Sequence, residues 1–166
     1  MQISAKTLMP CLWFDTQAEE AAKFYVSIFP NSKLGRISYY GNEGQEIHGG
    51  KPGSVLTAEF EINGQNFLAL NGGPHYKFTP AISFQVHCDT QEEIDYFWNR
   101  LADGGTEVQC GWVTDKYGLS WQVVPAVLPK MLMDPNRARA DRVMKAFMQM
   151  KKFDIAELQR AYARPH

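Results

Sequence analysis

The sequence has no excess of positive charge, no long apolar run and few cysteines. Its 17 Lys and Arg residues are balanced by 18 Asp and Glu residues, which gives a formal net charge of −1. A nucleic-acid-binding surface normally needs a basic excess. No apolar stretch approaches the roughly 18 residues of a membrane-spanning helix, and the N-terminus lacks the pattern of a signal peptide. We therefore expect neither nucleic-acid nor membrane partners.

The three cysteines, Cys11, Cys88 and Cys110, are odd in number and far apart. This spacing is typical of reduced thiols in the cytoplasm rather than of a disulfide framework or a CxxC metal site. Cys11 and Cys88 fit the pattern of small buried apolar residues better than that of nucleophiles. The sequence thus favours a cytoplasmic protein whose 166 residues form one domain, or two small repeats around a shared core.

One short pattern occurs twice. Asp15-Thr16-Gln17 precedes the acidic pair Glu19-Glu20, and Asp89-Thr90-Gln91 precedes Glu92-Glu93 with one residue fewer between them. In both copies a threonine stands three residues before a glutamate, which is the spacing of a helix capping box. An apolar stripe with helical spacing follows each cap, so we predict two equivalent amphipathic helices.

The segments around the two predicted helices also correspond. A strand-like run precedes each helix, and three more follow it, with tight turns at residues 63–65 and 115–118. The predicted strands after the helices are 34–40, 54–62 and 66–70 in the first half and 106–109, 111–114 and 119–124 in the second. Each half therefore reads as strand, helix and three strands, which indicates a duplication.

The C-terminal part departs from this pattern. Asp134-Pro135 predicts the start of one helix, and Asp154 with Glu157 predicts the start of a second, shorter one. Both helices carry apolar stripes, which would pack on the repeats or on a partner subunit. We expect this tail, about 130–164, to stabilise a homodimer, because buried apolar surface drives association.

Three phrases resemble a known family. "LWFDTQAEEAAKFYVSIFPNS", "GKPGSVLTAEFEINGQNFLALNGGP" and "QCGWVTDKYGLSWQVVP" are similar to the PhnB-like branch of the vicinal oxygen chelate superfamily, often labelled demethylubiquinone methyltransferases. The superfamily includes glyoxalase, bleomycin-resistance proteins and extradiol dioxygenases. The resemblance implies an α+β fold in which two βαβββ modules, about 7–71 and 81–125, curl mixed or antiparallel sheets into a cup-like barrel with outer helices. With the helical tail they would form a single glyoxalase-like domain, 1–166.

Strand alternation suggests which side chains would line the cup. The candidates for ligand binding are Cys11, Trp13, Ser83, Gln85, His87 and Gln122. Polar side chains on such a face need either hydrogen-bond partners or a ligand, and both interpretations stay open for Ser83, Gln85 and Gln122. Trp112 and Trp121, together with Trp13, could stack on a flat ligand.

Catalytic members of the superfamily hold a divalent ion through His and Glu side chains on four strands. The corresponding positions here are Met9, Ala69 (or Asn71 if the register slips), Ala81 and Gln122. A thioether, methyl groups and a neutral amide are poor ligands for a hard cation, so we expect no metal and no other cofactor. His48, His75 and His87 have no metal-ligand spacing. We expect His48 to be solvated, and we favour structural roles over acid–base roles for His75 and His87.

These expectations leave the function, and whether the protein is an enzyme at all, open. The favoured hypothesis is a small-molecule-binding protein or metal-independent enzyme of unknown substrate, with its ligand in the cup. The alternatives are a metal-dependent lyase, isomerase or dioxygenase, and a non-catalytic protein that sequesters its ligand. A methyltransferase is disfavoured, because no glycine-rich turn follows the first strand and opens a helix. The glycine-rich excursion 41–53, present in the first half only, is predicted to be a mobile lid at the cup mouth.

Overall fold

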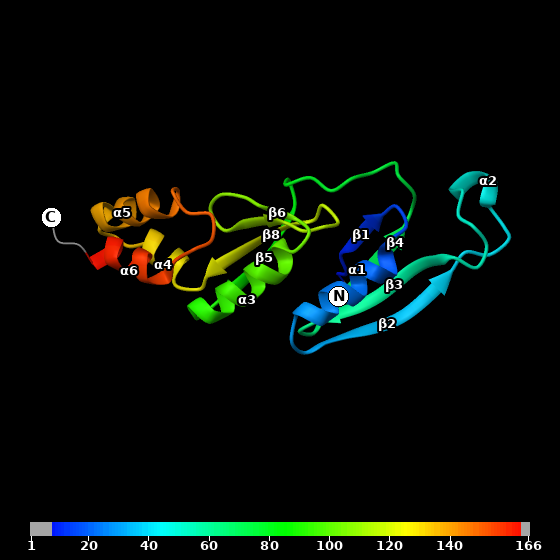
Figure 1. The fold of residues 1–166 in the computed structure, drawn as a ribbon, viewed down its shortest axis with the longest axis horizontal. Helices are drawn as coiled ribbons and strands as arrows, with labels where there is room; N and C mark the ends of the chain where they lie inside the picture. The colour runs from blue at the N-terminus through cyan, green and yellow to red at the C-terminus, as the bar shows by residue number, and fades with distance from the viewer. Residues whose placement is uncertain (1–7, 164–166) are drawn as a thin grey trace, which may run out of the picture. The chain divides into compact units, whose positions relative to one another are not determined.

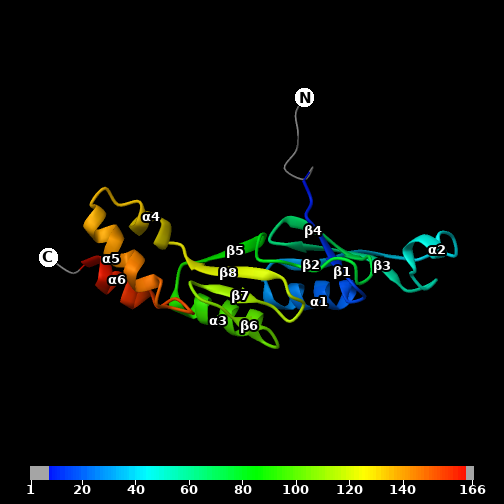
Figure 2. The same cartoon turned by 90° about the horizontal axis from the view of Figure 1, so that it is seen from above.

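The computed structural model describes residues 8–163, which divide after Phe78 into two units. The first unit contains β1 (Cys11–Phe14), α1 (Ala18–Ile28), β2 (Ser32–Tyr39), α2 (Gln45–His48), β3 (Val55–Ile62) and β4 (Gln65–Asn71). The second unit contains β5 (Ser83–Cys88), α3 (Gln91–Ala102), β6 (Thr106–Glu107), β7 (Trp112–Thr114) and β8 (Ser120–Pro125), followed by three tail helices. Figures 1 and 2 show α1 on one face of the first sheet and α3 on one face of the second.

The two units have the same sheet topology. The strand orders are β1-β4-β3-β2 and β5-β8-β7-β6. In each sheet the first strand of the module pairs in parallel with the last, and the other pairs are antiparallel. The predicted repeat of strand, helix and three strands is confirmed. Neither sheet closes on itself within the described residues, since β1 and β2, like β5 and β6, lie at opposite edges, and no barrel forms inside a unit.

The core of the first unit lies between α1 and the sheet. Tyr25 of α1 is fully buried, and its ring lies 5.8 Å from that of Phe60 on β3. Phe60 stacks at 5.1 Å on Phe67 of β4, its partner in the strand register. Beside this pair, Ala58 faces Ala69, and both are completely buried. Two small residues in register let the helix approach the sheet closely while the aromatic rings fill the rest.

The two helices begin in different ways, although their sequences predict the same cap. In α3, Thr90 and Glu93 form the predicted capping box, in which Thr90 Oγ1 accepts from Glu93 N at 3.2 Å. In α1 the predicted box of Thr16 and Glu19 is wrong. The extra residue in the first copy shifts the helix start, so Gln17 occupies the cap position without a side-chain bond.

Asn71 supplies the missing cap from β4. Its Oδ1 accepts from Ala18 N at 2.8 Å, and its Nδ2 donates to the Val55 carbonyl oxygen at 3.0 Å. The side chain is buried, with 7% of the residue exposed. A residue at the end of a strand thus fixes both the start of α1 and the adjacent end of β3.

The second unit repeats the arrangement of helix on sheet. Ile94, Trp98 and Leu101 of α3 are buried, and Trp98 Nε1 donates to Glu107 Oε1 at 2.8 Å. The predicted turn at 115–118 is organised by Asp115. Its carboxylate accepts from Tyr117 N, Leu119 N and Trp121 Nε1 at 2.9, 3.1 and 2.9 Å. These bonds hold the turn and direct the Trp121 ring into the core.

The tail consists of α4 (Leu128–Leu132), α5 (Arg137–Phe147) and α6 (Ile155–Ala163). The sequence missed α4, and the helix predicted to start at Asp134-Pro135 begins at Arg137, where Asn136 Oδ1 caps Arg139 N at 3.3 Å. The tail packs on its own second unit through Gln91. The Gln91 amide donates to the Phe153 carbonyl oxygen at 3.0 Å and accepts from Ile155 N at 2.9 Å.

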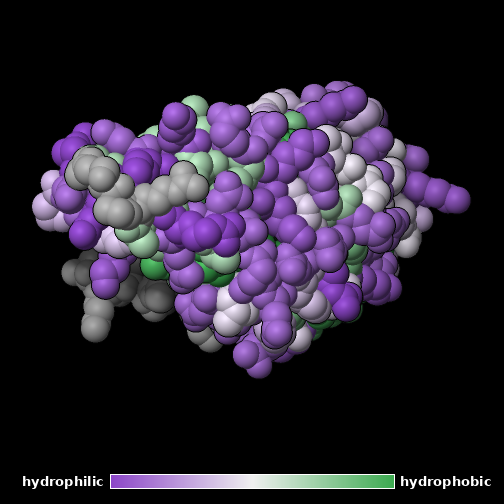
Figure 3. Space-filling model, turned by 60° about the vertical axis from the view of Figure 1, so that its left-hand side comes forward, coloured by the Kyte–Doolittle hydropathy of each residue, from purple (hydrophilic) through white to green (hydrophobic). Residues whose placement is uncertain are grey.

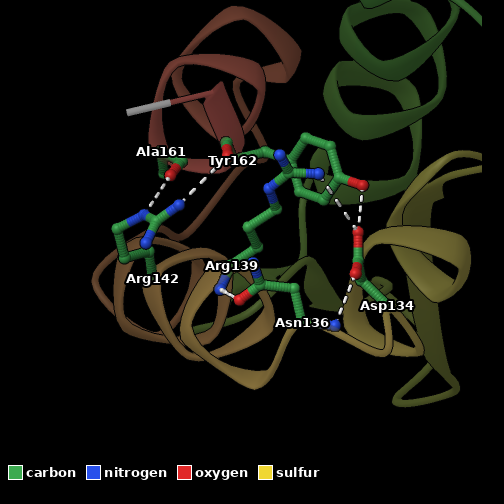
Figure 4. Close-up of polar contacts among 6 residues, drawn as sticks. All are labelled: Asp134, Asn136, Arg139, Arg142, Ala161 and Tyr162. Atoms are coloured by element: carbon green, nitrogen blue, oxygen red, sulfur yellow. Dashed lines mark hydrogen bonds and ion pairs between the residues drawn. The ribbon is translucent and has the colours of Figure 1, made fainter. Parts of the chain in front are cut away.

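A polar cluster joins the two ends of the tail (Figure 4). The Tyr162 hydroxyl donates to Asp134 Oδ2, and the Arg139 guanidinium lies over the Tyr162 ring at 5.6 Å. Arg142 donates to the Ala161 and Tyr162 carbonyl oxygens at 3.0 and 3.3 Å. A guanidinium at these last carbonyls suits the negative end of the α6 dipole. No helix among residues 8–163 is long and apolar enough to cross a membrane.

Candidate functional site

The face of the second sheet that points away from α3 carries most of the predicted site residues. Ser83 and Gln85 of β5 lie on this face, opposite Ser120 and Gln122 of β8. Gln122 Nε2 donates to Ser83 Oγ at 2.8 Å, and Gln85 Nε2 donates to Gln122 Oε1 at 3.3 Å. The structure therefore brings Ser83, Gln122 and Gln85 into one hydrogen-bonded chain, which we call the amide row.

The surroundings of the amide row are neutral and partly aromatic. Trp112 of β7 pairs in register with Gln122, so it extends the row across the sheet. His87 lies on the same face, is exposed, and pairs with Val124. Trp121, predicted to lie near the ligand, faces the core instead and is only 4% exposed. The prediction for Trp121 is wrong because it alternates with Gln122 along β8 and Asp115 holds its ring inward.

Cys11 and Trp13 lie on the corresponding face of the first sheet, opposite Leu68 and Leu70 of β4. The Trp13 indole donates to the Gly73 carbonyl oxygen at 2.9 Å and packs edge-to-face against Tyr76 at 4.9 Å. Cys11 is exposed, so the expectation that it is buried is wrong, although partial desolvation raises the pKa of its thiol and opposes its use as a nucleophile. This part of the first sheet is therefore apolar, and its Trp13 ring is held in place by a hydrogen bond and an aromatic contact.

Charges on this face of the first sheet occur as cross-strand pairs. Arg36 forms a bidentate pair with Glu59 at 2.9 and 3.1 Å, and Lys33 lies 3.5 Å from Glu61. The four side chains and Met9 line a shallow pocket of 320 Å³. Because each cation already has its carboxylate, the pocket offers a ligand little net charge.

The positions where the superfamily holds a metal do not fit one here. Ala69 is fully buried under α1, so the predicted register is wrong, and the residue on the open face is Leu68. Asn71 is used by the helix cap, and Gln122 by the amide row. Across residues 8–163 no three His, Cys, Asp or Glu side chains gather in a way that could hold an ion. The donor set lacks the charge and the imidazoles that divalent ions require.

The first unit contains a second cavity that was not predicted from the sequence. It has a volume of 710 Å³ and lies where β1 and β4 end and α1 begins. Part of its wall comes from the excursion 41–53, which contains α2 and supplies His48, Gly50 and Lys51. The mobility predicted for this excursion stays a prediction. Two signals could have pointed here: the extra residue before α1 and the excursion both occur in the first repeat alone.

His48 was expected to be solvated, but it is part of the excursion's structure. Its Nδ1 accepts from Gly50 N at 2.9 Å, and its Nε2 lies 3.0 Å from the Glu43 carbonyl oxygen. The imidazole stacks on Tyr40 at 4.5 Å, and the Tyr40 hydroxyl donates to the Asn71 carbonyl oxygen. These contacts are all satisfied by a neutral imidazole with its proton on Nε2.

The profile of the 3-demethylubiquinone-9 3-methyltransferase family matches residues 6–124. The chain belongs to this family. It is similar to the PhnB protein of Bacillus cereus, with 38% identity, 72% of this chain and 99% of that chain covered, and a TM-score of 0.64. The resemblance to PhnB-like proteins labelled demethylubiquinone methyltransferases is thereby confirmed.

A more distant structure, from Pseudomonas aeruginosa, shares the fold of this PhnB-like protein. A Pseudomonas aeruginosa protein is 19% identical, with 70% of this chain and 94% of that chain covered and a TM-score of 0.57. A glyoxylase/bleomycin resistance protein/dioxygenase domain from Frankia is 14% identical, with 72% and 91% covered and a TM-score of 0.43. None of the curated proteins matches the chain.

Proposed function

We propose that this PhnB-like protein binds a neutral small molecule on the open face of its second sheet without a metal ion. The amide row carries the proposal. In these hydrogen bonds Ser83 accepts and Gln85 donates, so the Ser83 hydroxyl can still donate to a ligand and the Gln85 amide oxygen can still accept from one. The residues of the row carry no formal charge. Such groups recognise carbonyl, amide and hydroxyl groups rather than a phosphate or carboxylate. Trp112, which pairs in register with Gln122, would pack against a flat part of the ligand.

The proposal treats the two modules and the tail as one glyoxalase-like domain that works as a cytoplasmic homodimer. Support for a dimer comes from the tail, where Met133, Met144 and Met148 are exposed. The face drawn in Figure 3 is mostly hydrophilic with small hydrophobic patches. Burial of the exposed methionine side chains of the tail against a second subunit would favour association. Sedimentation of the full chain at micromolar concentration tests this, and a monomer would contradict it.

The name of the family does not describe the chemistry that we propose. S-adenosylmethionine binding of the usual type uses a glycine-rich turn between a strand and a helix in an alternating order. Here Gly41, Gly44, Gly49, Gly50 and Gly53 lie between two antiparallel strands, β2 and β3. We therefore favour a binding protein or a metal-independent enzyme over a methyltransferase. Retention of an unchanged ligand would favour sequestration, and its conversion would favour catalysis.

The test begins with protein purified without a chelator or a metal-affinity tag. Native mass spectrometry would detect a co-purifying small molecule, and elemental analysis would count metal ions. We expect a bound neutral organic molecule in the wild type that is lost in Gln122→Ala and kept in Gln159→Ala, a control on the exposed side of α6. Near-stoichiometric manganese, iron, nickel or zinc would overturn the metal-independent proposal and support a metal-dependent lyase, isomerase or dioxygenase.

A further inference from the structure

The duplicated motif has different uses in the two units. In the second unit, Thr90 and Glu93 are engaged in the capping box, and Glu93 Oε2 also accepts from Asp89 N at 2.6 Å. In the first unit Asn71 has taken over the cap. This change leaves Asp15 and Thr16 outside the capping arrangement, and both line the cavity of 710 Å³. The same residue types thus stabilise a helix in one copy and face a cavity in the other.

The excursion 41–53 forms one wall of this cavity, and specific contacts hold that wall in place. His48, which bonds to Gly50 N, and the Tyr40 ring stacked on it both line the space. A Cβ atom at Gly50 would lie 2.5 Å from the Tyr40 ring, so only glycine allows this approach. The hydroxyl of Tyr40 is bonded to Asn71, which ties the wall to the end of β4. The excursion is therefore held by specific contacts on the side that faces the cavity.

The lining of the cavity carries charges of both signs. Asp15 and Glu20 come from the start of α1, while Glu19, beside them, is paired with Lys23 at 2.6 Å. Lys51 comes from the excursion. Within the part of the chain that the structure describes, neither Asp15 nor Lys51 takes part in an ion pair. A carboxylate and an ammonium without a protein counter-ion, in one cavity, suit a ligand that carries both charges.

We propose that this cavity, the α1 pocket, binds a small zwitterion of the amino-acid class. The ligand's ammonium group lies toward Asp15 and its carboxylate toward Lys51. Tyr40, Val55 and Pro74 provide apolar surface for its side chain. The volume is within the range of small-molecule sites, about 300–1,000 Å³. The α1 pocket is separate from the amide row, and its occupation does not depend on the function proposed above.

Three matched probes test the charge requirement on the full-length protein. L-phenylalanine carries both charges, phenethylamine lacks the carboxylate, and 3-phenylpropanoate lacks the ammonium. By isothermal titration calorimetry at neutral pH, we expect L-phenylalanine to bind and each of the other two to bind at least about tenfold more weakly. No binding of L-phenylalanine, or equal binding of phenethylamine, would overturn the proposal.

The repeat supplies a matched control for the site. Asp15→Asn and Lys51→Gln should each weaken L-phenylalanine binding about tenfold or more, with an unchanged circular dichroism spectrum. Asp89→Asn changes the equivalent residue of the second copy and should have no effect. Gln122→Ala should also leave this binding unchanged, which separates failure of the α1 pocket from failure of the amide row. Equal losses in Asp15→Asn and Asp89→Asn would refute the assignment.

Discussion

Replacing Asn71 by Ala tests whether α1 is capped from a distant strand. The substitution removes the acceptor for Ala18 N, and loss of a helix cap costs about 1 kcal/mol. It also removes the donor to the part-buried start of β3, where the Val55 carbonyl oxygen loses its partner. An unsatisfied buried group costs about 1–3 kcal/mol. We therefore expect Asn71→Ala to lower the free energy of unfolding by about 2–4 kcal/mol.

Two threonine variants make this prediction sharp. Thr90→Ala removes a cap that is formed and should cost about 1 kcal/mol, whereas Thr16→Ala removes no cap and should cost less than about 0.5 kcal/mol. Urea unfolding followed by circular dichroism gives the free energies. Amide hydrogen exchange then locates the loss, which should fall in α1 for Asn71→Ala and in α3 for Thr90→Ala. Equal costs for the two threonine variants, with a cost below about 0.5 kcal/mol for Asn71→Ala, would refute the reasoning.

Three further predictions follow from individual contacts. Gly72→Ala places a Cβ 2.2 Å from the Trp13 ring, so it should lower the free energy of unfolding by about 1–3 kcal/mol in urea titrations and alter tryptophan fluorescence. Burial, with the nearby acidic charges, raises the pKa of Cys88 from 9.0 to about 12, so stability from this thiol is present below pH 9 and is lost as pH rises toward 12; native protein at about pH 9 should resist iodoacetamide at Cys88 until it is unfolded. The Tyr162 hydroxyl lowers the pKa of Asp134 from 3.8, so the contribution of this carboxylate is present above pH 3.8 and is lost as pH falls further; Tyr162→Phe should raise that pKa, as read from carboxyl NMR titration.

Local patterns predicted the architecture well, because they depend on neighbouring residues. The apolar stripes of the two helices, the turn at 63–65 and the order of strands all follow from spacing that the chain shows directly. In α3 the predicted cap formed, since Thr90 and Glu93 lie within one turn. The alternation that placed Ser83, Gln85 and Gln122 on one face was also correct.

The failures share a physical cause, which is that a distant residue or a shift of one position decided the outcome. Thr16 has the spacing of a cap, but one extra residue moved the helix start and a strand residue took the role. Ala69 was assigned to a metal position by a register that the pairing of β3 and β4 does not follow. Trp121 was expected near the ligand although it alternates with Gln122 along β8. The α1 pocket is lined by residues from several segments between Asp15 and His75, and no local sequence pattern predicts that these segments come together.

The origin of the α1 cap has a consequence for how the chain folds. The cap of α3 lies beside the helix, so it can form as soon as that segment is free to coil. Asn71 and Ala18 are separated by 53 positions, so the cap of α1 must wait for a loop of that size to close. Such non-local contacts slow folding relative to local ones. During synthesis, the later helix can therefore acquire its cap without waiting for its own sheet, whereas the earlier one cannot be complete until β4 has emerged and paired.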